Sequence, residues 1–189
     1  EMVAEVLQYI ADGIKIKSAE ADAMYAGIVI DTNNFTNQTG VRTFEAAAFL
    51  RRNGADVTRV RKLFRDDMQD YKARAAAISS AEIYREAFSI GVCPSEGLPS
   101  PTIVCAQAAN ELLEIKGIKA SVVMTEYHGL IYLSARSIDE VNVQVMMEKL
   151  GGGGHRTIAG AQLSGISMEE AKDRVKAVID EMLQKGDIS

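Results

Sequence analysis

Four consecutive glycines, Gly151–Gly154, are followed directly by His155 and Arg156, and no other stretch of the sequence costs as much backbone entropy to order. Glycine loses more conformational entropy on folding than any other residue, and a single glycine is enough to end a helix. Two interpretations follow. In one, the backbone approaches a ligand closely, and its N–H groups gather as an anion-binding nest beside His155. In the other, the run is a flexible link between a helix and the small residues of 159–161.

Apolar spacing and helix-end signals predict a mostly helical first part. From Val3 to Ile10 the apolar residues recur at i, i+3, i+4 and i+7, so an amphipathic helix begins almost at the first residue. Such a helix without a cap predicts that the chain begins inside a longer protein. Ser18 is the expected N-cap of a second helix, which runs to Ile30 and is followed by a polar loop over 31–40. Further helices are expected over 43–52, 57–64 and 67–84.

The pattern changes after Arg85. A strand is expected over 87–92, and a loop with three prolines follows over 94–101. The remaining expected elements are a helix over 101–115 that starts at Ser100-Pro101, a hairpin of strands 120–126 and 130–135 joined at His128-Gly129, a helix over 141–150, and a final helix that runs from a capping box at 167–170 to Lys185. The sequence therefore predicts an α/β protein.

Composition and charge limit the classes of partner. Hydrophobic residues make up 47% of the 189 residues, which excludes a disordered chain, and no apolar run approaches the ~20 residues of a membrane-spanning helix. The N-terminus has no signal-peptide pattern, and two cysteines without a CxxC motif favour a reducing compartment, so we expect a cytoplasmic protein. Residues 1–85 carry 12 basic and 12 acidic groups, and residues 86–189 carry 9 and 14. Neither part has the basic excess of a protein that binds duplex DNA.

Two side chains outside the glycine run are candidates for chemistry. Asp31 follows the apolar run 27–30 and opens a polar loop, so its carboxylate could hold Mg²⁺ or Mn²⁺, or be a plain helix-end aspartate. Arg136 follows a hairpin strand, and its planar guanidinium suits a phosphate, although a solvated arginine fits the pattern as well. A two-metal centre needs several ligands, and the sequence has no DxD motif and no histidine cluster. If Asp31 is a metal ligand, its companions are therefore missing from this chain.

Three groups of segments are more specific together than any one alone. They are 26–35 (AGIVIDTNNF), 39–47 (TGVRTFEAA), and 134–137 (SARS) with 142–145 (NVQV) and 151–155 (GGGGH). In order and spacing they resemble the C-terminal half of a DHH-superfamily phosphoesterase, and most closely the cyclic-di-AMP phosphodiesterases of the GdpP type. The resemblance extends over essentially the whole chain.

The resemblance implies a fold, a reaction and a site. Residues 1–85 would be the C-terminal portion of an incomplete DHH domain, and residues 86–189 a DHH-associated, substrate-binding domain with a mixed sheet. The family hydrolyses a phosphodiester at two metal ions, usually Mn²⁺ and with Mg²⁺ as the alternative. Asp31 inherits the role of a metal ligand. Arg136, Gly151, Gly152, Gly153, Gly154 and His155 inherit contacts to the nucleotide phosphate, and His155 also polarises the substrate.

The resemblance also implies what this chain lacks. The family's DxD and DHH motifs supply most metal ligands and would lie upstream of Glu1, together with membrane helices that anchor such proteins with this part in the cytoplasm. The chain alone would bind a cyclic dinucleotide or short oligonucleotide without hydrolysing it. Sheet edges or apolar faces left exposed would favour a homodimer.

Two other functions remain open. A nanoRNase or 3′-phosphoadenosine phosphatase shares the superfamily and would act on a short oligonucleotide or a nucleotide. A non-catalytic RNA-binding or nucleotide-binding module is the second alternative, because the domain also resembles the C-terminal part of alanyl-tRNA synthetases. The acidic balance of residues 86–189 and the segment around Asp31 argue against that module.

Overall fold

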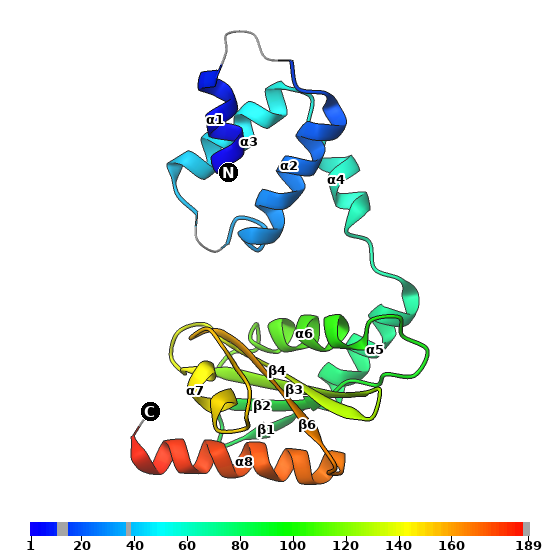
Figure 1. The fold of residues 1–189 in the computed structure, drawn as a ribbon, viewed down its shortest axis with the longest axis vertical. Coiled ribbons are helices and arrows are strands. Elements are labelled where there is room, and N and C mark those ends of the chain that lie inside the picture. Colours follow the sequence, from blue (N-terminus) through cyan, green and yellow to red (C-terminus); the bar gives the residue numbers. More distant parts are fainter. Residues whose placement is uncertain (11–14, 37–38, 187–189) are drawn as a thin grey trace. The chain divides into compact units, whose positions relative to one another are not determined.

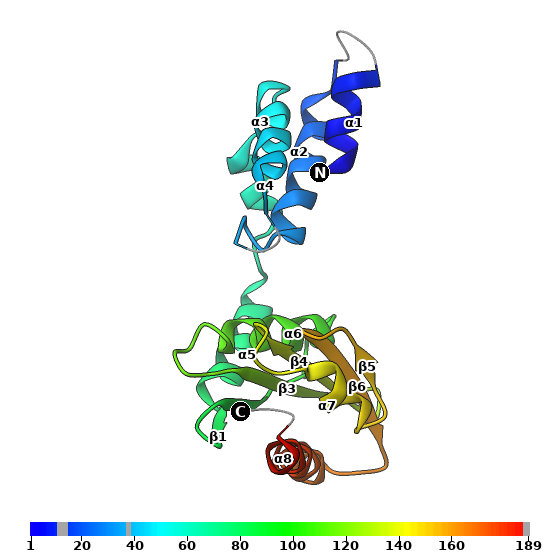
Figure 2. The same cartoon turned by 90° about the vertical axis from the view of Figure 1, so that its left-hand side faces the viewer.

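The computed structural model describes residues 1–10, 15–36 and 39–186 (Figures 1 and 2). The chain forms two compact units, Glu1–Arg65 and Asp66–Ser189. The division lies upstream of residue 85, where the sequence pattern changes, because helix α5 (Met68–Ser79) packs on helix α6 (Pro101–Leu112) and on strand β2 (Phe88–Val92). In the described residues, no helix is both long and apolar enough to cross a membrane.

The first unit consists of helices. They are α1 (Met2–Ile10), α2 (Ser18–Asp31), α3 (Val41–Arg52) and α4 (Val57–Leu63). Helix α2 packs on α3 and α4, and α1 packs on α3, around a small core of Ala4, Ala21, Ile28, Ala46, Leu50 and Ala55. The buried carboxylate of Asp22 fixes the start of α4. It accepts the backbone N–H of Asp56 at 2.7 Å and Nε of Arg59 at 2.6 Å.

Helix ends of the first unit follow most of the sequence signals. Asp56 caps α4, which covers most of the helix expected over 57–64, because its Oδ1 accepts the N–H of Arg59 at 3.0 Å. The prediction that Ser18 caps α2 is wrong. Ser18 is the first helical residue, and at Lys17, the cap position, the backbone N–H donates to Glu20 at 3.0 Å.

The second unit contains a mixed six-stranded sheet in the order β1-β2-β3-β4-β6-β5. Its other strands are β1 (Glu82–Tyr84), β3 (Ala120–Tyr127), β4 (Leu130–Ser137), β5 (Gly153–Gly154) and β6 (Ile158–Ser164). Strands β2 and β3 pair in parallel, and every other pair is antiparallel. The predicted hairpin at His128-Gly129 joins β3 and β4, and both residues have positive φ (+51° and +74°), as a tight turn between twisted strands requires.

Helices cover both faces of this sheet, α5 and α6 on one side and α7 (Val143–Glu148) and α8 (Met168–Lys185) on the other (Figure 1). The larger core lies on the α7–α8 side, where alternate residues of β4 and β6 meet the apolar stripe of α8. Examples are Leu133, Leu163 and Ile179, all buried. The α/β class and the mixed sheet expected from the sequence are confirmed.

Three strands were not predicted. Residues 82–84 were assigned to the end of a helix over 67–84, but α5 ends at Ser79 and β1 follows. The alanine-rich sequence before Ser79 favours a helix, and only pairing with β2 extends the chain beyond it. Strands β5 and β6 follow α7, in a part of the sequence where glycines and other small residues gave no strand signal.

Candidate functional site

The glycine run forms the edge of the sheet and continues the end of α7. The N–H groups of Gly151 and Gly152 donate to the carbonyl oxygens of Glu148 (3.0 Å) and Met147 (2.8 Å) and so close the helix. Gly153 and Gly154 then form β5, which lies beside β6 at the edge of the sheet (Figure 2). The first two glycines therefore close a helix and the last two pair as a strand, so the run is not a flexible link. The N–H groups of Gly151 and Gly152 already have partners within the chain.

Close packing explains two of the four glycines. A Cβ on Gly152 would lie 2.1 Å from the carbonyl oxygen of Gly160, and a Cβ on Gly154 would lie 2.5 Å from the Cα of Ala159. Gly154 also has φ +149° and Gly151 has φ +79°, which side chains rarely adopt. Gly153 differs, because a Cβ there meets nothing within 4 Å. It is the position where the fold itself does not demand glycine.

His155 follows β5 directly and begins the turn to β6. Its N–H donates to the carbonyl oxygen of Ile158 at 2.7 Å, and the N–H of Ile158 returns to the carbonyl of His155 at 3.3 Å. The side chain of His155 is exposed. Arg156, in the turn, is neutralised by Asp139, whose Oδ1 lies 2.8 Å from its Nε.

Arg136 lies on β4, opposite Ile158 of β6. The order β4-β6-β5 therefore brings Arg136 to the same end of the sheet as His155, although 19 positions separate them in the sequence. Two residue pairs further along, Ser134 is opposite Gly160, which is in turn opposite Gly153.

The guanidinium of Arg136 has no carboxylate partner among the described residues. Its Nε donates to Oδ1 of Asn110 on α6 at 3.0 Å and its Nη1 to the carbonyl of Ala135 at 2.9 Å. Burial lowers the pKa of Arg136 from its usual value, because removal from water penalises the charged form. Arg74, by contrast, contacts both Asp66 and Glu111 at 2.6 Å. Arg136 thus supplies a positive charge that a bound anion would neutralise.

A hollow of about 550 Å³ adjoins the glycine run on the second unit. Its lining includes Tyr132 and Gln162, which face each other across β4 and β6, together with Gly151 and Gly152. The sequence analysis did not identify Tyr132 or Gln162. The alternation of buried and half-exposed residues along β4 is the signal that marks Tyr132 as facing away from the larger core.

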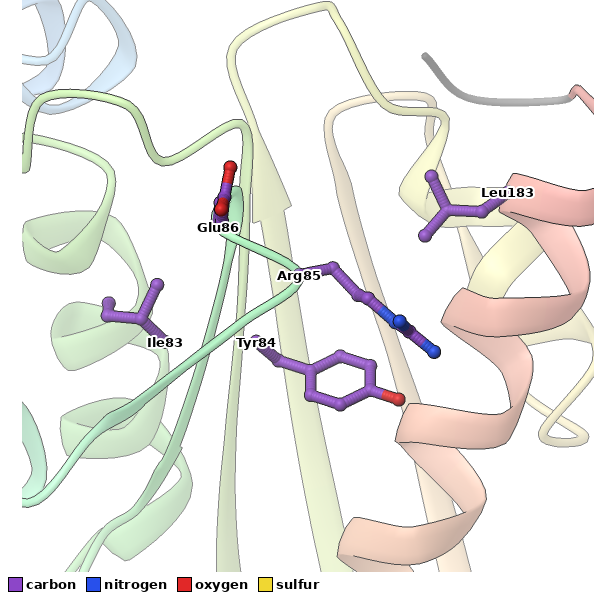
Figure 3. Close-up of a pocket in the computed structure, with 5 residues that line it drawn as sticks. All are labelled: Ile83, Tyr84, Arg85, Glu86 and Leu183. Atoms are coloured by element: carbon purple, nitrogen blue, oxygen red, sulfur yellow. The ribbon is translucent and has the colours of Figure 1, made fainter.

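A larger cavity of about 820 Å³ lies near the β1–β2 hairpin, lined by Ile83, Tyr84, Arg85, Glu86 and Leu183 (Figure 3). Tyr84 and Arg85 point towards α8, whereas Ile83 lies on the other side of the strand. The charge of Arg85 is already neutralised by Asp180, because its Nε lies 2.8 Å from Oδ1 of that carboxylate. The other carboxylate oxygen, Oδ2, accepts a hydrogen bond from the hydroxyl of Tyr84 at 2.9 Å. Size alone would favour this cavity. Its neutralised arginine makes it the weaker candidate for an anion.

Asp31 belongs to the first unit, where it is the exposed last residue of α2. The apolar run that precedes it is only partly buried, because Ile28 is 3% exposed and the neighbouring Ile30 is 64% exposed. Three successive residues after Thr32 have positive φ, Asn33 (+45°), Asn34 (+57°) and Phe35 (+64°). Left-handed backbone is costly in residues other than glycine and concentrates at functional sites.

The described residues do not fit a two-metal centre. Within 1–10, 15–36 and 39–186, no group of three or more His, Cys, Asp or Glu side chains could hold a metal ion. A single exposed carboxylate at a helix C-terminus, where the helix dipole already places partial negative charge, gives one oxygen ligand group. The residues within these ranges therefore provide at most one part of such a centre.

Comparison with known proteins identifies relatives of the whole chain. Residues 100–185 match the family described as the DHHA1 domain. The cyclic-di-AMP phosphodiesterase GdpP of Bacillus subtilis is 42% identical over 98% of this chain, and the cyclic-di-AMP phosphodiesterase PdeA of Listeria monocytogenes is 40% identical over 95%. The chain spans only 28% and 27% of their lengths.

A solved structure supports the fold. An exopolyphosphatase-related protein from Bacteroides fragilis superposes with a TM-score of 0.78 over 88% of this chain and 51% of its own, at 21% identity. The likeness at that identity concerns the fold alone. The sequence matches identify residues 100–185 as a DHHA1 domain and show that the chain is related to the GdpP and PdeA cyclic-di-AMP phosphodiesterases over nearly its whole length.

Proposed function

We propose that the chain is part of a metal-dependent phosphodiesterase that hydrolyses cyclic di-AMP to the linear dinucleotide, and that its second unit binds the substrate. The observation that carries the proposal is the 42% identity to the B. subtilis phosphodiesterase, which extends over 98% of this chain. Because the chain spans 28% of that relative, the reaction is proposed for a longer protein that contains it.

Arg136 and the segment 153–155 are the proposed phosphate contacts. The guanidinium of Arg136 lacks a carboxylate partner among the described residues and can give two parallel N–H donors to a phosphate. Gly153 has open space where a side chain would stand, so a phosphate oxygen can approach its backbone closely. The exposed imidazole of His155, at the same end of the sheet, would donate a hydrogen bond to the phosphodiester and polarise it.

Asp31 is the proposed metal ligand of the first unit. The strained turn that follows it supports a functional role, because such backbone persists only where its surroundings hold it. The described residues offer no group of ligands to complete a manganese or magnesium centre, so the remaining ligands are proposed to come from elsewhere in a longer protein. The proposal therefore predicts that the chain alone binds the substrate without cleaving it.

A second candidate is a phosphatase or ribonuclease of the same superfamily. A bifunctional oligoribonuclease and PAP phosphatase of Thermus thermophilus, NrnA, is 37% identical over 73 residues, which is 38% of this chain. The shorter match makes a short oligonucleotide the weaker substrate proposal.

Calorimetric titration of the chain with cyclic di-AMP, with the linear dinucleotide and with 3′-phosphoadenosine 5′-phosphate tests the proposal. We expect cyclic di-AMP to bind most tightly and Arg136→Ala to weaken it by about tenfold or more, since hydrogen bonds to charged groups contribute ~1.5–3 kcal/mol. Equal affinity for Arg136→Ala and the unaltered chain would contradict the phosphate contact.

Hydrolysis tests the role of Asp31. In a longer protein that includes the upstream sequence and is supplied with Mn²⁺, Asp31→Ala should abolish cleavage of cyclic di-AMP. Full activity of that variant would show that the metal assignment is wrong.

A further inference from the structure

The hollow beside the glycine run has a lining unlike that of a phosphate site. Seven residues surround its roughly 550 Å³, and none of them is charged. Volumes of this size are typical of small-molecule sites, which are mostly apolar with a few placed polar groups. A neutral lining suits an uncharged part of a ligand and disfavours the burial of a phosphate.

Bare backbone forms much of this lining. Gly160 of β6 carries no side chain, and Gly152 approaches it so closely that a Cβ would lie 2.1 Å from its carbonyl oxygen. The adjoining Gly151 and Ala161 add at most a methyl group. Small residues at these positions leave a shallow space with no bulky side chain, which a flat ring can enter.

Two side chains with polar groups line this space. Tyr132 and Gln162 are directly opposite each other across β4 and β6, so they share one face of the sheet. The ring of Tyr132 lies 6.4 Å from that of Tyr127 at an interplanar angle of 56°, a tilted contact that helps to hold it. The exposed amide of Gln162 makes no hydrogen bond to the part of the chain that the structure describes.

The hollow lies at a fixed separation from the proposed phosphate contacts. Tyr132 and Arg136 are four residues apart on β4, which corresponds to about 13 Å along an extended strand. Ser134 lies between them on the same face, opposite Gly160. The hollow and the proposed phosphate contact of Arg136 therefore share one face of β4, four residues apart.

We propose that this hollow is a purine-base subsite, in which Tyr132 stacks on the base and Gln162 hydrogen-bonds to the adenine edge. This inference rests on the proposed function and specifies which part of the dinucleotide the second unit recognises. Aromatic rings stack on any base, and a glutamine amide matches the N6 donor and N7 acceptor of adenine. Guanine presents two acceptors at the same edge, so the amide nitrogen of Gln162 could donate to it but the amide oxygen would have no donor.

Titration of the full chain with four ligands tests the subsite: cyclic di-AMP, AMP, ribose 5-phosphate and cyclic di-GMP. Tyr132→Leu should weaken cyclic di-AMP and AMP at least about fivefold, as expected for loss of one stacked base, and should leave ribose 5-phosphate unchanged. Tyr132→Phe retains the ring and should bind as the unaltered chain does. Gln162→Arg should lower the affinity ratio of cyclic di-AMP to cyclic di-GMP at least about fivefold, because arginine reads guanine.

Tyr84→Leu, in the cavity of Figure 3, is the matched control and should change none of these affinities. Thermal unfolding of each variant checks that it is folded. Unchanged cyclic di-AMP and AMP affinities for Tyr132→Leu and Gln162→Arg, with a loss for Arg136→Ala, would overturn the base subsite and leave the proposed function standing. AMP binding that depends on Tyr132, without any binding of cyclic di-AMP, would support the subsite and overturn the proposed function.

Discussion

The two units of the chain bury apolar surface very differently. In the second, helices cover both faces of a six-stranded sheet, and large side chains such as Met124, Met146 and Ile179 are fully buried. In the first, four of the six core residues are alanines, while Tyr9 is 88% exposed and Val41 75% exposed. Burial of apolar area is the main driving force of folding, so the second unit has the larger source of stability.

The difference bears on where recognition can be located. A binding site needs side chains held by a rigid frame, and the sheet of the second unit fixes Arg136, Tyr132 and the glycine run by strand pairing. Asp31, at the end of a helix in the less extensively packed unit, has no comparable frame among the described residues. We therefore assign substrate recognition to the second unit.

Separating the units is the strongest test of this contrast. Residues 66–189 produced alone should unfold in one cooperative transition, because their core is self-contained. Residues 1–65 alone should show none, because a domain of that size with an alanine-rich core has little net stability. Thermal melts followed by circular dichroism provide the measurement. A sharp transition for residues 1–65 would contradict the claim that the first unit has little stability of its own.

A pair of glycine substitutions separates packing from ligand binding within the second unit. Gly152→Ala should destabilise it by about 1–3 kcal/mol or more, because the new Cβ would overlap the Gly160 carbonyl. Gly153→Ala meets nothing within 4 Å and should leave the melting temperature nearly unchanged while weakening cyclic di-AMP binding. Denaturant unfolding and calorimetry measure the two effects. A stable Gly152→Ala, or a Gly153→Ala that binds normally, contradicts the respective assignment.

The two thiols report on the packing of the second unit. Burial raises the pKa of Cys93 to about 11 and that of Cys105 to about 12, so little thiolate exists at neutral pH. Both should resist a disulfide reagent at pH 8 in the folded chain and react rapidly in guanidinium chloride. Rapid reaction of either thiol under native conditions would show that the α5–α6 side of the sheet opens more readily than its burial indicates.

Acid should weaken the second unit through Glu181. Lys185 and Lys149 lower the pKa of this carboxylate from 4.5 to about 2, so its ion pairs stabilise the fold above pH 4.5. That contribution is lost as the pH falls through 2, because the carboxylate becomes protonated. Glu181→Gln should therefore lose less stability between pH 4.5 and 2 than the unaltered chain. Identical acid unfolding of the two proteins would contradict the shift.

Sequence reasoning identified the elements whose signals are local. The capping box at Ser167, the Ser100-Pro101 helix start and the His128-Gly129 turn depend on neighbouring residues, and α8, α6 and the β3–β4 hairpin occur where these signals predict them. Strand β1 was missed because only its pairing with β2 overrides a helix-forming sequence. Arg85 and Glu86, in the turn between β1 and β2, have positive φ, which such residues rarely adopt. No sequence signal predicts this turn.

The candidate site was only partly accessible to sequence reasoning. Arg136 and the glycine run were singled out by residue type, and strand order then placed them at one end of the sheet. The juxtaposition of Tyr132 with Gln162 became visible only through the β4–β6 register, which depends on contacts 30 residues apart. The close approach that requires glycine at Gly152 and Gly154 is equally non-local, since it involves the backbone of β6.

The most direct test of substrate recognition by the second unit is an NMR titration of the isotopically labelled chain with cyclic di-AMP. We expect the largest changes in backbone amide shift at Arg136, at 153–155, and at Tyr132 and Gln162. Changes confined to the first unit, or to the hairpin around Arg85, would contradict it.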